Sequence, residues 1–202
     1  LKSPATPQGL CRIFLFLNWY NILVSRKRCI VLIDGSNFYF KLKDLKLQNL
    51  LDFDFTSFAT KLADGYRIAH ATYYVGKVRT DGTEHTQRLF NNQRKLFAYL
   101  KKHAFSYSLG YLLKSDGRMH EKGVDVNIAV DILVATYENL CDRIIVVSSD
   151  TDLLPAIKKA KEKGKIVEYV GFSHKVSVAL VANCSATTLL KREDLLPFIK
   201  AK

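Results

Sequence analysis

Aspartates follow two apolar runs of this sequence, each at the point where the run ends. Asp150 and Asp152 come shortly after residues 144–147, and Asp34 comes directly after residues 30–33. Such runs of β-branched residues are typical of strands buried on both faces of a parallel sheet, where chemistry collects at the carboxyl ends. If the two strands are neighbours, the acids share one cleft, and their mutual repulsion favours a bound cation. Oxygen ligands select Mg²⁺ or Mn²⁺, which commonly serve reactions at phosphate.

The apolar periodicity predicts a helix over residues 126–140. Two more aspartates stand just before it and within it. Asp125 stands just before this helix, where a carboxylate is either a metal ligand or the N-cap. Asp131 interrupts the apolar run IAVDILV, so we expect it to be partly buried and therefore hydrogen-bonded, paired or bound to metal. The other acids have structural alternatives as well, Asp34 in a turn and Asp152 as the cap of the next helix.

Strands and helices alternate from residue 28 onward, which predicts an α/β domain with a mainly parallel sheet and right-handed crossovers. One domain, residues 28–202, accounts for the pattern. The expected strands cover residues 30–33, 68–75, 105–113, 144–147, 166–170 and 187–190. The expected helices cover residues 38–45, 58–64, 86–102, 126–140, 153–163 and 176–181, with a last one from residue 192.

The composition favours a polyanionic partner. The 202 residues include 31 Lys and Arg against 19 Asp and Glu, a formal net charge of +12. Such a charge suits nucleic acid or an anionic membrane surface, although a soluble protein can be basic without either partner. With 48% hydrophobic residues, the chain is long and apolar enough to bury a core and is not a disordered polymer.

Residues 1–27 differ from the rest and are interpreted as an apolar appendage. The run at residues 10–24 is interrupted by Arg12, Asn18 and Asn21. It is shorter than the roughly 20 residues that a transmembrane helix needs. A signal peptide is disfavoured because no small-residue cleavage site follows. A peripheral membrane contact through residues 10–24 is the remaining alternative.

The cysteines indicate a reducing compartment. Cys11, Cys29, Cys141 and Cys184 are widely spaced, without a CxxC pair or a His at zinc-ligand spacing. We therefore expect reduced thiols and a cytoplasmic protein.

Three motifs together resemble the NYN domain family of the PIN-like nuclease group. They read VLIDGSN at 31–37, EKGVDVNIAVDIL at 121–133 and VVSSDTDLLPAIKKAKEKGKIVEYVG at 146–171. The resemblance implies a Rossmann-like, three-layer α/β/α sandwich (PIN-like) and metal-dependent cleavage of RNA. By position, it implies catalytic and metal-binding roles for the acids Asp34, Asp125, Asp150 and Asp152, and supporting roles for Asn37 and Asp131.

The third motif departs from the family pattern at three positions. Where family members commonly read SGDSDF, this chain has Ser149, Thr151 and Leu153 in place of Gly, Ser and Phe. Both acids of the motif remain, so the departure affects the backbone fit and the substrate more than metal binding.

The resulting hypothesis is a ribonuclease in which one or two Mg²⁺ or Mn²⁺ ions activate water for attack on an RNA phosphodiester. The alternative is a non-cleaving RNA-binding or regulatory adaptor on the same fold. A phosphatase of the haloacid dehalogenase type is disfavoured, because Ser36 stands where such enzymes have a second Asp, two residues after Asp34.

Contacts to RNA are assigned to residues around the expected cleft. The candidates for phosphate are Lys122, Lys77, Arg79 and Lys41, although a basic protein has some lysine near any site by chance. Phe38 and Tyr39 are candidates for stacking on bases, with a place in the core or at the rim as the alternative.

Overall fold

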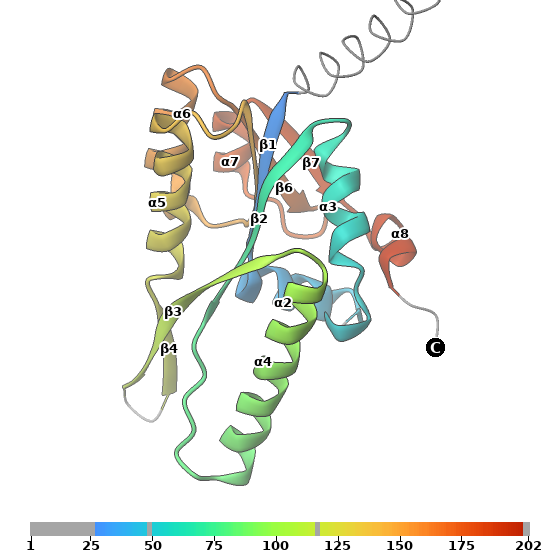
Figure 1. The fold of residues 1–202 in the computed structure, drawn as a ribbon, viewed down its shortest axis with the longest axis vertical. Coiled ribbons are helices and arrows are strands. Elements are labelled where there is room, and N and C mark those ends of the chain that lie inside the picture. The colour runs from blue at the N-terminus through green and yellow to red at the C-terminus, as the bar shows by residue number, and fades with distance from the viewer. Residues whose placement is uncertain (1–26, 48–49, 116–117, 200–202) are drawn as a thin grey trace, which may run out of the picture.

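The computed structural model describes residues 27–47, 50–115 and 118–199. Within them the chain forms one sheet flanked by helices (Figure 1). The strands are β1 (Arg28–Asp34), β2 (Arg67–Gly76), β3 (Ser106–Ser115), β4 (Arg118–Lys122), β5 (Arg143–Val147), β6 (Ile166–Phe172) and β7 (Ala186–Leu190). The helices are α2 (Gly35–Asp44), α3 (Phe55–Ala63), α4 (Glu84–Lys102), α5 (Val124–Tyr137), α6 (Leu154–Glu162), α7 (Val178–Asn183) and α8 (Arg192–Leu195), with short 3-10 turns η1 (Leu50–Asp52), η2 (Thr151–Leu153) and η3 (Leu196–Phe198).

The strand order is β4-β3-β2-β1-β5-β6-β7. The described strands pair in parallel except β3 with β4, which are antiparallel. From β1 the chain proceeds outward through β2 and β3, and later returns to place β5 on the other side of β1. The order therefore reverses between β1 and β5, the place where open α/β sheets form a crevice at the carboxyl ends of their strands. The two strands are neighbours, which was the condition for their acids to share one cleft.

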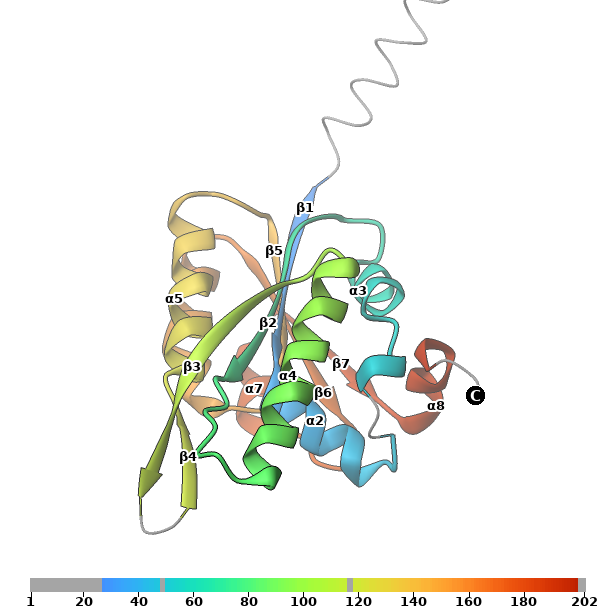
Figure 2. The same ribbon diagram turned by 60° about the horizontal axis from the view of Figure 1, so that its bottom comes forward.

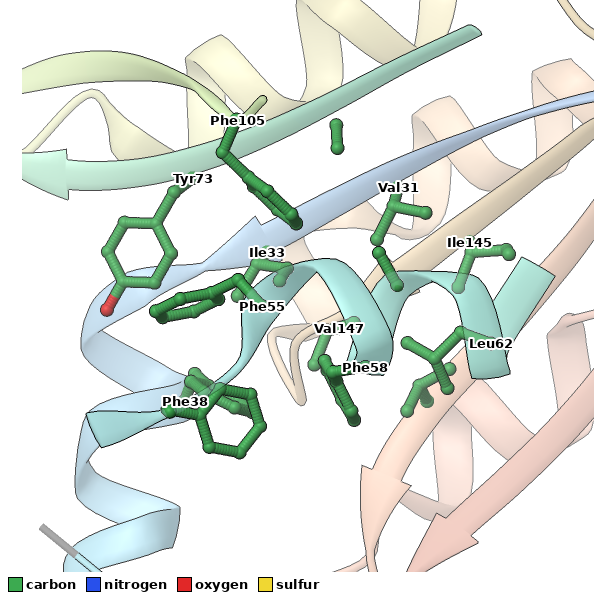
Figure 3. Packing of buried hydrophobic residues seen from close by; sticks show 14 of the residues in the cluster. Val31, Ile33, Phe38, Phe55, Phe58, Leu62, Tyr73, Phe105, Ile145 and Val147 are labelled. Carbon is green, nitrogen blue, oxygen red and sulfur yellow. The ribbon is translucent and has the colours of Figure 1, made fainter. Parts of the chain in front are cut away.

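The helices cover both faces of the sheet, as a three-layer sandwich requires. Helices α5, α6 and α7 lie on one side, and α2, α3, α4 and α8 lie on the other (Figures 1 and 2). Each side has its own buried cluster. The cluster under α2 and α3 is rich in aromatic rings, with Phe38, Phe55 and Phe58 packed against Val31 and Val147 of the sheet (Figure 3). The predicted α/β/α class is confirmed.

The hairpin of β3 and β4 is the element that the sequence pattern did not predict. After the strand expected over residues 105–113, the chain returns through β4, a short and polar edge strand that was not expected. Its sequence, RMHEK, has no apolar alternation, which is why a periodicity search misses it. The hairpin extends beyond the body of the sheet and leads directly into α5 (Figure 2).

Residues 1–26 lie outside the described part, so the expected appendage and its membrane contact stay predictions. In the described part, no helix is both long enough and apolar enough to span a membrane. Cys29, Cys141 and Cys184 are free thiols, as expected, and Cys11 lies outside the described residues.

Candidate active site

A cleft of about 540 Å³ lies beyond the carboxyl ends of β1 and β5. Its lining includes three of the predicted acids, Asp34, Asp125 and Asp150. The other lining residues are Ser36, Asn37, Phe40, Lys122, Gly123, Val124 and Val126. The start of α2 thus supplies one part of the cleft, and the junction of β4 with α5 supplies another.

Asp34 is held in a single orientation by two hydrogen bonds. It is the last residue of β1 and the N-cap of α2, where its Oδ1 accepts a hydrogen bond from the Asn37 backbone N–H at 3.0 Å. Its Oδ2 accepts a second bond, 2.8 Å long, from the hydroxyl of Ser148. The side chain is 9% exposed, so it can reach the cleft only along one side. Capping and cleft lining are compatible because a carboxylate has about four lone-pair sites.

The residue after Asp34 must be small. A Cβ on Gly35 would lie 2.3 Å from Tyr73 Cε1 and 2.6 Å from the Tyr74 carbonyl oxygen. The Tyr73 hydroxyl also donates to the Gly35 carbonyl at 3.1 Å. Glycine therefore allows α2 to start close against β2, which places Asp34 at the cleft.

Asp150 is positioned by the turn that follows β5. Its Oδ1 accepts a hydrogen bond from the Asp152 backbone N–H at 2.9 Å, which makes it the N-cap of η2. Its own N–H donates to the Ser148 hydroxyl at 3.1 Å. Ser148 therefore connects the backbone of Asp150 with the carboxylate of Asp34. The sequence reasoning missed Ser148, because a serine beside two aspartates has no signal that separates it from an ordinary turn residue.

Asp125 lies in the first turn of α5 and is not its N-cap. The N-cap is Gly123, whose φ of 81° is in the left-handed region that favours glycine. The alternative of Asp125 as N-cap is therefore wrong, and its side chain lines the cleft instead. The amino ends of α2 and α5 both border the cleft, and their partial positive charge favours nearby carboxylates. Lys122, at the end of β4, adds a full positive charge to the same lining.

Two of the predicted acids are not among the residues that line the cleft. Asp152 contributes its backbone N–H to Asp150, and its side chain is exposed on η2. The alternative of Asp152 as the cap of the next helix is wrong, since the N-cap of α6 is Leu153.

Asp131 lies farther along α5 and accepts a hydrogen bond of 2.5 Å from the Tyr74 hydroxyl. The two side chains line a separate cavity of about 170 Å³. Burial, followed by the bond to Asp131, raises the pKa of Tyr74 above its ordinary value. The expected partial burial and hydrogen bonding of Asp131 are therefore confirmed.

The remaining predicted basic residues lie outside the cleft lining. The Lys41 ammonium donates to the Lys175 carbonyl oxygen at 3.1 Å, and burial together with the charge of Lys175 lowers the pKa of Lys41. Lys77 and Arg79 are exposed in the loop after β2. The Lys77 backbone N–H donates to the Gly110 carbonyl at 3.1 Å, which places this loop beside the β3–β4 hairpin.

The acids of the cleft are spread apart. Within residues 27–47, 50–115 and 118–199, no three His, Cys, Asp or Glu side chains lie close enough together to hold a metal ion as they stand. The donor chemistry nevertheless suits a hard cation, because three carboxylates face one open space. Mg²⁺ commonly keeps several waters and uses only one or two carboxylates directly, so a spread set of acids fits it.

Several solved structures and one curated protein are similar to this chain. T5 5′-exonuclease with bound zinc matches at a TM-score of 0.38 and 18% identity, over 64% of this chain and 52% of that one. The nicotinamidase of Staphylococcus aureus matches at a TM-score of 0.31 and 12% identity, over 83% and 87% of the two chains. TM-scores this low support no inference about activity.

An uncharacterized protein of Methanocaldococcus jannaschii is 46% identical over 57 residues, which are 28% of this chain and 24% of that protein. The chain thus spans about a quarter of this relative and about half of the T5 exonuclease. The model of the NYN domain family matches residues 28–191, from the start of β1 to the residue after β7. Since this match covers most of the chain and all of its sheet, the chain belongs to the NYN domain family.

Proposed function

We propose that this protein is a metal-dependent ribonuclease that hydrolyses RNA phosphodiester bonds in the cleft beyond β1 and β5. The observation that carries the proposal is the convergence of Asp34, Asp125 and Asp150 from three separate segments on one cleft. Membership of the NYN family supports a nuclease-type function, as the resemblance of the motifs implies. The net charge of +12 supports a polyanionic substrate.

The proposed roles follow from how each side chain is held. Asp34 is held by hydrogen bonds from Ser148 and from the start of α2. Asp150 and Asp125 are half-buried and therefore open to a ligand or to ordered water. Asn37, in the same lining, can donate its side-chain amide to a phosphate oxygen.

Two further residues have supporting roles in the proposal. Lys122 stands in the lining, where its ammonium can attract a phosphate to a place that the acids alone would repel. Asp152 keeps Asp150 in place through its backbone and orients ligands from outside the lining.

A divalent cation is the cofactor that these carboxylates fit, with Asp34, Asp125 and Asp150 as its holders, directly or through water. When bound, it would lower the pKa of an attacking water and neutralise charge that develops on the phosphate. Both Mg²⁺ and Mn²⁺ suit oxygen ligands.

The test is cleavage of labelled single-stranded and structured RNA with Mg²⁺ or Mn²⁺. We expect cleavage that EDTA abolishes, and a loss of about 100-fold or more in Asp34→Asn and in Asp150→Asn, because each variant removes a charged ligand at nearly constant shape. Glu138→Gln is the matched control, since Glu138 is an exposed acid at the far end of α5. Cleavage that persists unchanged in both Asp variants, or in EDTA, would refute the proposal.

A non-cleaving RNA-binding adaptor is the second candidate. The net charge of +12 favours it, because such a charge attracts a polyanion whether or not the protein cleaves it. Tight RNA binding without cleavage under any of the metal conditions would select the adaptor over the nuclease.

A further inference from the structure

Phe40 is an exposed aromatic side chain in the lining of the acidic cleft. It is 59% exposed, although Phe38, two residues earlier, is fully buried. Single exposed apolar residues are common on protein surfaces and need no explanation by themselves. Phe40 differs because it shares a cleft with Asp34, Asp125 and Asp150. The residue that can meet a base at this site is therefore Phe40, whereas Phe38 belongs to the core.

The position of Phe40 on α2 is well defined. It stands four residues after Ser36, so the two side chains lie on the same face of the helix, and both line the cleft. The Tyr39 ring packs edge-on against the Phe40 ring with centroids 5.6 Å apart. The Phe40 ring thus packs against Tyr39 and is also part of the cleft lining.

A second exposed aromatic lies outside the cleft lining, next to its β4–α5 part. Tyr111 of β3 is 65% exposed and stands directly opposite Lys122 of β4 in the antiparallel register. Directly opposed residues of such a pair present their side chains on the same face. A Cβ added to Gly123 would lie 3.7 Å from Tyr111 Cδ2, so the Tyr111 ring reaches the residue that lines the cleft next to Lys122.

Positive charge accompanies the tyrosine at this rim. Lys122 is part of the cleft lining, and the backbone of Lys77 bonds to Gly110, the neighbour of Tyr111. Aromatic rings beside lysines suit a nucleic acid strand, because bases stack on the rings while the ammonium groups contact the phosphates.

We propose that Phe40 and Tyr111 are base-stacking sites at the two parts of the cleft, so that an RNA strand crosses the acids between two stacked bases. The inference rests on the proposed function, because it places an RNA phosphate over the carboxylates. A base in a duplex is already stacked between its neighbours, so these sites select an unpaired strand. Stacking tolerates every base, since each has a π-face, and the sites therefore carry little sequence preference.

The experiment measures binding apart from cleavage. Fluorescence anisotropy is recorded with a labelled single-stranded RNA of mixed sequence and with the same strand in a duplex, with Ca²⁺ in place of Mg²⁺ and Mn²⁺ so that a cation balances the charge of the acids while hydrolysis is suppressed. We expect Phe40→Ala and Tyr111→Ala each to weaken single-strand binding by about tenfold and to change duplex binding by less than about twofold. Phe40→Trp should retain the affinity of the unmodified protein, whereas Phe40→Leu should behave as Phe40→Ala, which separates stacking from general apolar contact.

Tyr137→Ala is the matched control. Tyr137 is 58% exposed, nearly the same fraction as Phe40, but it is the last residue of α5 and stands eleven positions after Val126 of the cleft lining. At the helical rise per residue, that is about 16 Å from the cleft. We expect Tyr137→Ala to leave binding of both RNA forms unchanged.

The outcomes for stacking and for catalysis are separable. Single-strand binding that is unchanged in Phe40→Ala and Phe40→Leu, or an equal loss in Tyr137→Ala, would overturn the stacking sites even if the protein cleaves RNA. The same holds if the unmodified protein binds neither RNA form. A selective loss of single-strand binding in a protein that never cleaves would support the stacking sites and refute only the nuclease.

Discussion

The hydroxyl of Ser148 donates a hydrogen bond of 2.8 Å to the carboxylate of Asp34, although the two residues stand 114 positions apart. Both are buried, Ser148 at 2% and Asp34 at 9% exposure. The same hydroxyl accepts the backbone N–H of Asp150 at 3.1 Å. One side chain therefore links two acids of the cleft, Asp34 at the end of β1 and Asp150 in the turn that follows β5.

Replacing Ser148 by alanine tests this link. The change removes the hydroxyl that bonds to both Asp34 Oδ2 and the Asp150 N–H in a buried site. We therefore expect the free energy of unfolding to fall by about 1–3 kcal/mol. Because partners that orient ligands typically affect activity by about 10–100-fold, RNA cleavage should fall by at least about tenfold. Urea unfolding and initial cleavage rates measure the two effects.

Ser149→Ala is the control for this variant. The Ser149 hydroxyl lies 3.4 Å from the Tyr169 hydroxyl, longer than a good O–H···O hydrogen bond, so its loss should change both quantities little. Equal effects of the two serine variants would contradict a specific role for Ser148.

Gly35→Ala should disturb the start of α2. The added methyl group would overlap Tyr73 and the backbone carbonyl of Tyr74, and a backbone atom cannot move aside as a flexible side chain can. We expect a loss of about 1–3 kcal/mol in stability together with reduced cleavage, because Asp34 moves with the helix start.

Gly65→Ala provides the comparison. Gly65 has a φ of +84° but nothing within 4 Å of an added Cβ, so alanine there introduces backbone strain without overlap. It should cost about 1–2 kcal/mol and leave cleavage unchanged. Cleavage that is lost in Gly65→Ala and retained in Gly35→Ala would contradict the inference that Gly35 places Asp34 at the cleft.

Arg143→Met should be strongly destabilising. The Arg143 guanidinium pairs with Glu168, whose side chain is 5% exposed and also accepts a bond of 2.7 Å from Thr188. Removing the arginine leaves a buried carboxylate without its counter-charge, which costs about 3–5 kcal/mol. Thermal or urea unfolding measures the loss.

Lys159→Met is the matched control for that change. Lys159 pairs with Glu162 at 3.0 Å on the surface of α6, with side chains 45% and 64% exposed. Exposed pairs contribute less than about 1 kcal/mol, so the control should unfold almost as the unmodified protein does. Similar losses in the two variants would show that burial does not determine how much the Arg143–Glu168 pair contributes to stability.

The thiols of Cys29 and Cys141, which are buried, and of Cys184, which is half-buried, should react slowly with Ellman's reagent. Burial raises the pKa of Cys29, Cys141 and Cys184 from 9.0 to about 11. Since the thiolate is the reactive form, little of it is present near pH 7.5, and labelling should accelerate as the pH rises toward 11. The test uses Cys11→Ser, because Cys11 lies outside the described residues.

Full labelling of that variant is expected only in denaturant. The sign of the linkage also predicts that stability falls between pH 9 and pH 11, since the folded state holds these protons to higher pH than the unfolded chain. Rapid labelling of Cys29 in the native protein at pH 7.5 would contradict its burial.

The local pattern of residues was sufficient for the alternating elements and for the identity of the acids. Apolar runs at 30–33 and 144–147 predicted β1 and β5, because buried parallel strands exclude polar residues along their whole length. The same runs locate two of the candidate acids, since Asp34 and Asp150 are the first carboxylates after them. β4 escaped prediction because a short polar edge strand has no such signature.

Tertiary structure decided which of these residues meet. Strand order is a matter of pairing between segments more than a hundred residues apart, and only that pairing brought Ser148 to Asp34 and the amino end of α5 to the same cleft. It also placed Asp131 against Tyr74, outside the cleft lining, and turned Phe40 toward the acids while Phe38 entered the core. Residue type and periodicity determine structure over a few positions along the chain, whereas a cleft is made by the packing of whole elements. That packing cannot be inferred from the local pattern.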